Sequence, residues 1–94
     1  MKAMPPLAQP EILLVDDTPE DIETAVAVLR DNNFKLRIAT QGSTAFKLIR
    51  QHRPDLILLD VYMPEMDGFE VCKIIKNDPD WQGIPIIFLT SSNE

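Results

Sequence analysis

Residues 56–64 read LILLDVYMP, an apolar run that ends in an aspartate and is followed by a methionine-proline turn. Apolar runs of this length are typical of strands that are covered on both faces of a sheet. Residues 11–17 read EILLVDD and show the same pattern, an apolar strand that ends in an acidic pair. Two parallel strands of this kind would bring Asp16, Asp17 and Asp60 together at one edge of the sheet.

Helical patterns separate these apolar runs. Thr18 followed by Pro19 is typical of a helix start, with threonine as N-cap and proline at the first helical position. The apolar residues that follow recur with helical spacing, at Ile22, Ala25, Val26 and Leu29. Ser43 is a candidate N-cap for a second helix. A third helix is predicted over about residues 69–76, after the Asp67-Gly68 turn.

Two further strands complete the pattern, at 36–39 and 84–90. The alternating order predicts an α/β fold, a doubly wound parallel sheet with helices on both faces. Thr90 ends the last predicted strand, so it is expected at the same edge as Asp60. Ligands of such sheets bind beyond the carboxyl ends of the strands.

Length and composition exclude several classes of protein. Ninety-four residues allow one small domain, and the net charge of -6 gives no basic surface for direct nucleic-acid binding. No apolar stretch approaches the roughly 20 residues needed to span a membrane. The single cysteine, Cys72, fits a reducing compartment. Residues 1–10 contain no signal-peptide core, and we interpret them as a disordered leader or a linker before a domain at 11–94, located in the cytoplasm.

The three carboxylates indicate a chemistry of their own. Carboxylates this close cannot all stay ionised in a partly dry site, so the cluster requires a cation. Mg²⁺ is favoured because it takes oxygen ligands and is commonly held by one or two carboxylates together with a phosphate. A carboxylate such as Asp60 is also a competent covalent acceptor of a phosphoryl group.

The motifs resemble those of one known family. Residues 12–17 (ILLVDD), 60–68 (DVYMPEMDG) and 85–90 (PIIFLT) are similar, in this order and spacing, to the receiver domain of two-component response regulators. The resemblance spans about residues 11–94 and implies a flavodoxin-like receiver fold with strand order 2-1-3-4.

The resemblance also implies roles for individual residues. Asp60 matches the phospho-accepting aspartate, which receives its phosphoryl group from a sensor histidine kinase or a phosphotransfer protein. Asp17 and Asp60 match direct Mg²⁺ ligands, Asp16 a ligand mainly through water, and Tyr62 a backbone-carbonyl ligand. Thr90 matches the switch hydroxyl that contacts the phosphoryl group. Such a domain is a signalling switch and is not an enzyme that turns over an external substrate.

The sequence departs from the family pattern after Thr90. Receiver domains continue with a further helix, a fifth strand that ends in Lys-Pro, and a last helix, and none of these follows within the 94 residues. We therefore expect a receiver domain that is incomplete at its C-terminus. An alternative is a phosphorylation-incompetent, receiver-like interaction or dimerisation module, self-associating through an exposed edge at residues 86–89.

Two further alternatives have less support. Aspartate-dependent phosphatases carry Asp-x-Asp after their first strand, whereas the acceptor candidate here, Asp60, ends the third strand. A nucleotide-binding protein would carry a glycine-rich phosphate loop after the first strand, where this chain has Asp16-Asp17.

Overall fold

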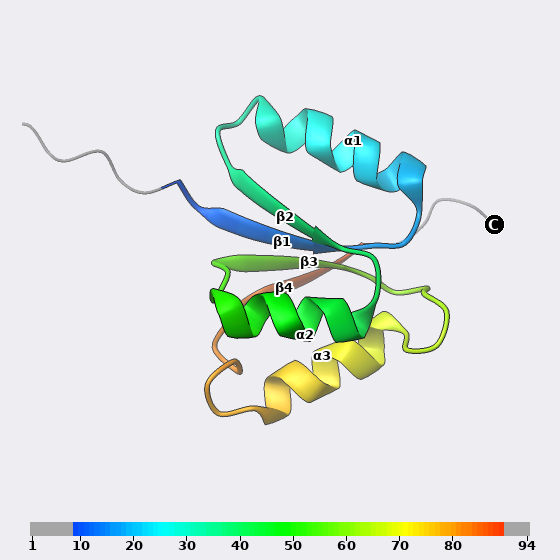
Figure 1. The fold of residues 1–94 in the computed structure, drawn as a ribbon, viewed down its shortest axis with the longest axis vertical. Coiled ribbons are helices and arrows are strands. Elements are labelled where there is room, and N and C mark those ends of the chain that lie inside the picture. Colours follow the sequence, from blue (N-terminus) through cyan, green and yellow to red (C-terminus); the bar gives the residue numbers. More distant parts are fainter. Residues whose placement is uncertain (1–8, 90–94) are drawn as a thin grey trace, which may run out of the picture.

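The computed structural model describes residues 9–89, which form four strands and three helices in strict alternation (Figure 1). In chain order, the elements are β1 (Glu11–Val15), α1 (Pro19–Arg30), β2 (Lys35–Ala39), α2 (Gly42–Gln51), β3 (Leu56–Asp60), α3 (Gly68–Asn77) and β4 (Ile86–Leu89). The predicted order of elements is confirmed.

The strands form one parallel sheet in the order β2-β1-β3-β4. β1 and β3 are neighbours in the middle of the sheet, with Val15 opposite Leu59. Asp60, one residue further along β3, lies opposite Leu89 of β4. The predicted sheet and its strand order are therefore both confirmed, and the order brings the ends of β1 and β3 side by side.

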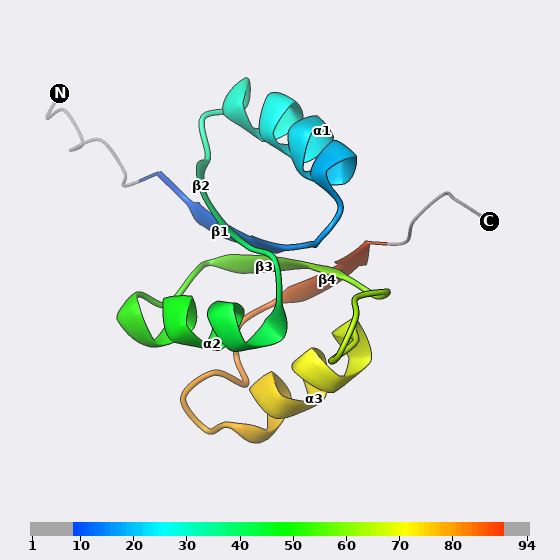
Figure 2. The same cartoon turned by 45° about the vertical axis from the view of Figure 1, so that its right-hand side comes forward.

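The helices cover the two faces of the sheet unequally. Helix α1 lies alone on one face, whereas α2 and α3 lie together on the other, as both views of the molecule show (Figures 1 and 2). The main core lies between the sheet and the α2–α3 layer. Its buried residues are Leu13, Val15, Ala39, Ala45, Ile49, Ile57, Leu59, Met63, Val71, Ile75 and Ile84. No residue of α1 is fully buried, so the predicted apolar stripe of this helix is only partly covered.

Helix starts were predicted with mixed success. Thr18 is the N-cap of α1 and Pro19 opens the helix, as predicted, although the Thr18 side chain makes no capping hydrogen bond. The prediction of Ser43 as N-cap of the second helix was wrong. The N-cap is instead Gln41, in extended geometry and two residues before Ser43, and the helix begins at Gly42. Glycine fits at position 42 because α3 packs closely there: an added Cβ would lie only 3.0 Å from the Val71 side chain, which is closer than an ordinary van der Waals contact.

The strand ends also differ slightly from the predictions. β4 begins at Ile86, two residues later than predicted, and β2 begins at Lys35, one residue earlier than predicted. Thr90, predicted as the last residue of the fourth strand, lies outside the described residues. Within the described part of the chain, every helix is too short or too polar to cross a bilayer.

Candidate metal and phospho-acceptor site

Three carboxylates meet at the carboxyl ends of the two central strands. Asp16 and Asp17 follow β1 directly, and Asp60 is the last residue of β3. Each of the three offers an oxygen atom, and these oxygens all lie within 4.8 Å of one another. The predicted cluster is thus present, and its physical cause is the parallel pairing of β1 with β3.

Backbone groups hold two of these side chains in place. The carboxylate of Asp16, which is 1% exposed, accepts a hydrogen bond of 2.9 Å from the Thr18 N–H. The Asp16 N–H in turn donates to the Ala39 carbonyl at 3.0 Å, which ties the start of the loop to β2. Asp60 is 3% exposed and accepts one long hydrogen bond, 3.3 Å from the Tyr62 N–H.

Burial and mutual repulsion destabilise the ionised forms of these groups. Desolvation, followed by the neighbouring charge of Asp16, raises the pKa of Asp60 to about 6. Desolvation is also the largest cause of the raised pKa of Asp16, and Asp21 and Asp17 add to it. The ionised forms of Asp16 and Asp60 are therefore destabilised by burial and by the neighbouring negative charges. A bound cation would stabilise these ionised forms, because its positive charge offsets the repulsion between the carboxylates.

The donor set fits a small divalent cation. Carboxylate oxygens from three residues within 4.8 Å of one another, two of the residues buried, would suit Mg²⁺ or Mn²⁺ and not a soft metal that prefers thiolate or imidazole. Asp60 has few hydrogen bonds of its own, which leaves oxygen lone pairs free for a ligand.

The loop between β3 and α3 is tightly fastened beside the cluster. The Gly68 N–H donates to the Val61 carbonyl at 2.9 Å, and the Met66 N–H donates to the Pro64 carbonyl at 2.8 Å. Met63 is 8% exposed and belongs to the main core, so it anchors the loop to the domain. Glu65, at the exposed tip, takes left-handed backbone geometry with φ of 72°.

Gly68 is required here for its lack of a side chain. Its φ is not positive, so the turn does not use the conformational freedom of glycine. A Cβ at this position would instead collide with the carbonyl group of Asp60 and stand 3.0 Å from the Val61 Cα. The glycine therefore lets the start of α3 lie directly against Asp60.

Asp67 caps a helix, a role that was not predicted from the sequence. We interpreted it as a turn residue, and it is the N-cap of α3, within a reciprocal capping box. Its carboxylate accepts from the Glu70 N–H at 2.9 Å, while the Glu70 carboxylate accepts from the Asp67 N–H at 3.0 Å. The spacing Asp-x-x-Glu was the sequence signal for this capping box.

The remaining predicted site residues are placed as follows. Tyr62 follows Asp60 by two residues; its side chain is 71% exposed, and its backbone N–H donates to the Asp60 carboxylate. Thr90 lies outside the described residues. Asp21, on the first turn of α1, was not predicted as a neighbour of the site, and its negative charge contributes to the raised pKa of both Asp16 and Asp60.

A single parallel sheet, covered by helices on both faces and carrying an acidic cluster at the ends of its central strands, defines the class of this α/β domain. Comparison with known proteins identifies the family. The model of the response regulator receiver domain matches residues 12–94, and the chain belongs to this family.

Individual relatives agree with the family match. The chain is 40% identical over 83 residues to the DNA-binding response regulator MtrA of Mycolicibacterium smegmatis, covering 88% of this chain and 35% of that protein. The signal receiver domain of a histidine kinase from Syntrophus aciditrophicus has a TM-score of 0.83 at 38% identity, covering 90% of this chain and 64% of that structure. The Mn²⁺-bound form of the response regulator Rcp1 has a TM-score of 0.81 at 36% identity, covering 90% and 68%. The chain thus spans about a third of the length of MtrA, and about two thirds of these solved structures.

Proposed function

We propose that this receiver domain accepts a phosphoryl group on Asp60 and acts as a signalling switch. The observation that carries the proposal is the geometry of the acidic cluster, in which Asp60 lies within 4.8 Å of the carboxylates of Asp16 and Asp17. The family membership supports it, because the motif around Asp60 is the one that carries the phospho-acceptor in the resemblance described above.

The proposed reaction is a transfer from a phosphohistidine. A carboxylate oxygen of Asp60 attacks phosphorus, an O–P bond forms as the N–P bond to the imidazole breaks, and the imidazole takes up a proton as it leaves. Two features of this chain favour attack. The carboxylate is held in place by the Tyr62 N–H, and it is poorly solvated because it is 3% exposed.

We propose Mg²⁺ as the cofactor, held by Asp17 and Asp60, by Asp16 mainly through water, and by the backbone carbonyl of Tyr62. The closeness of the carboxylates and the raised pKa values of Asp16 and Asp60 support a cation there, and the Mn²⁺-bound Rcp1 shows a similar domain with such an ion. When bound, a divalent cation supplies charge neutralisation for phosphoryl oxygens. Thr90 is proposed as the hydroxyl that contacts the phosphoryl group.

The partner is proposed to be a sensor histidine kinase or a phosphotransfer protein, in the cytoplasm. Cys72 is a free thiol, which suits a reducing compartment. We further propose that the domain is not a turnover enzyme and does not bind nucleic acid directly, in keeping with its net charge of -6.

The test is intact mass after incubation with acetyl phosphate and Mg²⁺. We expect one added phosphoryl group on the wild type, no addition to Asp60→Asn, and undiminished addition to Asp67→Asn, a matched carboxylate-to-amide control outside the cluster. Addition to Asp60→Asn at the level of the wild type would show that the acceptor is another residue.

A second candidate function, self-association through β4, is supported by a separate observation. Ile87 is 51% exposed and Phe88 is 38% exposed, and within the described residues β4 pairs only with β3. Phe88 also packs at 5.1 Å against the ring of Phe69, which is itself 60% exposed. We propose that this apolar edge pairs with another copy of the chain when nothing else covers it.

Light scattering at micromolar concentration tests this second candidate. We expect the wild type to be larger than a monomer and Ile87→Lys to shift it toward the monomer. Val28→Lys, which replaces a residue that is 56% exposed on α1, is the matched control and should leave the size unchanged. A wild type that is a stable monomer would contradict self-association without affecting the phosphorylation test.

A further inference from the structure

A groove lies between helix α1 and the edge strand β2. It has a volume of about 490 Å³. Its apolar walls are formed by Val26 from α1 and by Phe34, Leu36 and Ile38 from the strand side, and Arg30 also lines it. The groove exists because α1 covers its sheet face alone and buries none of its residues fully. None of the acidic-cluster residues lines it.

Strand β2 has two chemically different faces. Side chains alternate along a strand, so Leu36 and Ile38 face the groove while Lys35 and Arg37 belong to the opposite face. Arg37 is already paired with Glu11. Lys35 is exposed, and no salt bridge to it is found in the described part of the chain.

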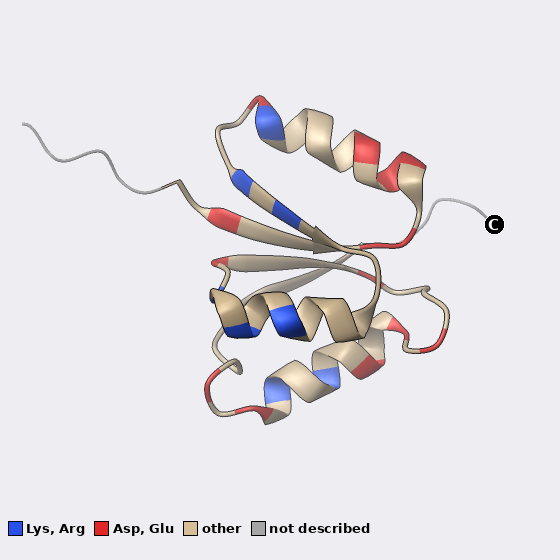
Figure 3. Cartoon of the chain, viewed as in Figure 1, with Lys and Arg blue, Asp and Glu red and all other residues tan. Residues whose placement is uncertain are grey.

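The outer edge of β2 is open for pairing. β2 is the terminal strand of the sheet and, among residues 9–89, it pairs only with β1. Such an edge presents backbone N–H and C=O groups to which an extended chain can add as a further strand. Figure 3 shows basic positions in blue at the end of α1 and along β2. Arg30, in the last turn of α1, lines the groove, whereas Lys35 lies on the opposite face of the strand.

From this arrangement we infer a docking site for an extended, acidic segment of a partner protein in which apolar and acidic residues alternate. The segment adds to β2 as a fifth strand of the sheet. Its apolar side chains lie over the groove beside Leu36 and Ile38, and its carboxylates lie on the other face beside Lys35. Charge complementarity selects this partner, because the edge offers the exposed cation of Lys35 on one face and the apolar residues Leu36 and Ile38 on the other.

The inference is independent of the proposed phosphorylation. It uses neither Asp60 nor a cation at the acidic cluster, so loss of phosphoryl transfer in Asp60→Asn leaves the docking site intact. Binding and phosphorylation can therefore fail separately.

The experiment uses the full chain and two fluorescent probe peptides, an acidic one of sequence EVEIEVE and a basic one of sequence KVKIKVK. Binding is followed by fluorescence anisotropy, and the site is located by amide chemical shifts. We expect the acidic peptide to bind more tightly than the basic one, although the net charge of the chain is -6 and opposes this. The shifts should fall in β2 and in the facing side of α1.

Charge-reversal variants make the test specific. Lys35→Glu should bind the acidic peptide about fivefold more weakly and should prefer the basic peptide, since like charges across paired strands repel. Lys47→Glu, at an exposed position on α2, changes the net charge equally and should bind like the wild type. A peptide N-methylated at alternate residues should not bind, because strand addition needs its N–H groups.

Several outcomes would overturn the inference. Equal weakening by Lys35→Glu and Lys47→Glu would reduce the effect to net charge, and undiminished binding of the N-methylated peptide would exclude strand addition. Absence of binding by the wild type would overturn it too. Binding that appears only after residues 1–8 are removed would also overturn the inference, because a segment of this chain would then be the occupant. Binding that appears only at chain concentrations too low for β2 to pair with a second copy would overturn it for the same reason.

Discussion

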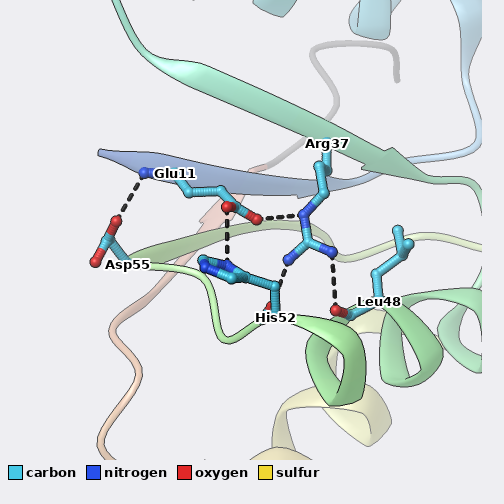
Figure 4. A network of polar contacts seen from close by, with 5 residues as sticks. All are labelled: Glu11, Arg37, Leu48, His52 and Asp55. Atoms are coloured by element: carbon cyan, nitrogen blue, oxygen red, sulfur yellow. Dashed lines mark hydrogen bonds and ion pairs between the residues drawn. The ribbon is translucent and has the colours of Figure 1, made fainter. Parts of the chain in front are cut away.

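The carboxylate of Glu11 forms an ion pair with the guanidinium of Arg37 at the amino end of the sheet, opposite to the end that carries Asp60 (Figure 4). The Glu11 side chain is 5% exposed. Its other oxygen lies 2.9 Å from Nδ1 of His52, and its backbone N–H donates to the carboxylate of Asp55 at 2.7 Å. Arg37 also donates to the carbonyls of Leu48 and His52, so the network joins β1, β2, the end of α2 and the start of β3.

This network predicts a large effect of replacing Glu11. Glu11→Ala should lower the free energy of unfolding by about 3 kcal/mol, because it leaves the half-buried charge of Arg37 without its partner. His52→Ala should cost less than about 1 kcal/mol, since the His52 side chain is 68% exposed. Urea unfolding monitored by circular dichroism measures both. Equal losses of unfolding free energy in the two variants would contradict the prediction that Arg37, and not His52, is the important partner of Glu11.

The acidic cluster predicts a pH-dependent stability. Because the pKa of Asp60 rises to about 6 from an ordinary 3.8, the native protein binds this proton more tightly than the unfolded chain does. Without divalent ions, the contribution of Asp60 to stability is therefore fully present below the ordinary value, and it is lost as pH rises through about 6. Asp60→Asn should be more stable than the wild type at neutral pH, and the difference should vanish in acid.

Magnesium provides the control for this pH effect. Added Mg²⁺ should stabilise the wild type at neutral pH, in proportion to its binding to the native state, and should stabilise Asp60→Asn much less. Denaturant titrations across pH, with chelator or with Mg²⁺, give the comparison. A difference between wild type and variant that does not change with pH would contradict the raised pKa.

The contact between Gly68 and Asp60 predicts a graded glycine series. Gly68→Ala should cost about 3 kcal/mol or more, because its Cβ meets backbone atoms of Asp60 and Val61 that cannot move aside. Gly42→Ala should cost less, since its Cβ would meet the side chains of Val71 and Met66. Gly83→Ala should be tolerated, because it would approach only the flexible end of Arg53. Thermal unfolding ranks the three, and a ranking with Gly83 as the most sensitive position would contradict this account.

The tip of the β3–α3 loop predicts a stabilising substitution. Glu65 has left-handed backbone geometry, which costs a non-glycine residue about 1 kcal/mol and is better tolerated by asparagine. Glu65→Asn should therefore raise the free energy of unfolding by about 0.5–1 kcal/mol. Glu65→Ala removes the same charge without relieving the backbone, so it is the matched control and should show no gain. A gain of equal size in both variants would assign the effect to charge.

Local sequence patterns predicted much of this structure. The apolar runs that end in Asp16 and Asp60 predicted both central strands, since continuous apolar strands are required wherever helices cover both faces of a sheet. The Thr18-Pro19 pair predicted the start of α1, because N–H groups in the first turn of a helix have no intrahelical acceptor, so proline loses no hydrogen bond there. Ser43 misled because capping is decided by backbone geometry, and the extended residue here is Gln41.

The sequence by itself determined which residues carry the carboxylates and that each follows a strand, because period and residue type are local properties of the chain. Only the tertiary structure decided that carboxylate oxygens of Asp16, Asp17 and Asp60 lie within 4.8 Å of one another, that burial raises the pKa of Asp60, and that Gly68 must lack a side chain. It also decided that Glu11 would be buried in an ion pair with Arg37. Distance and dielectric environment depend on which strands become neighbours, and that pairing is a property of the whole folded chain.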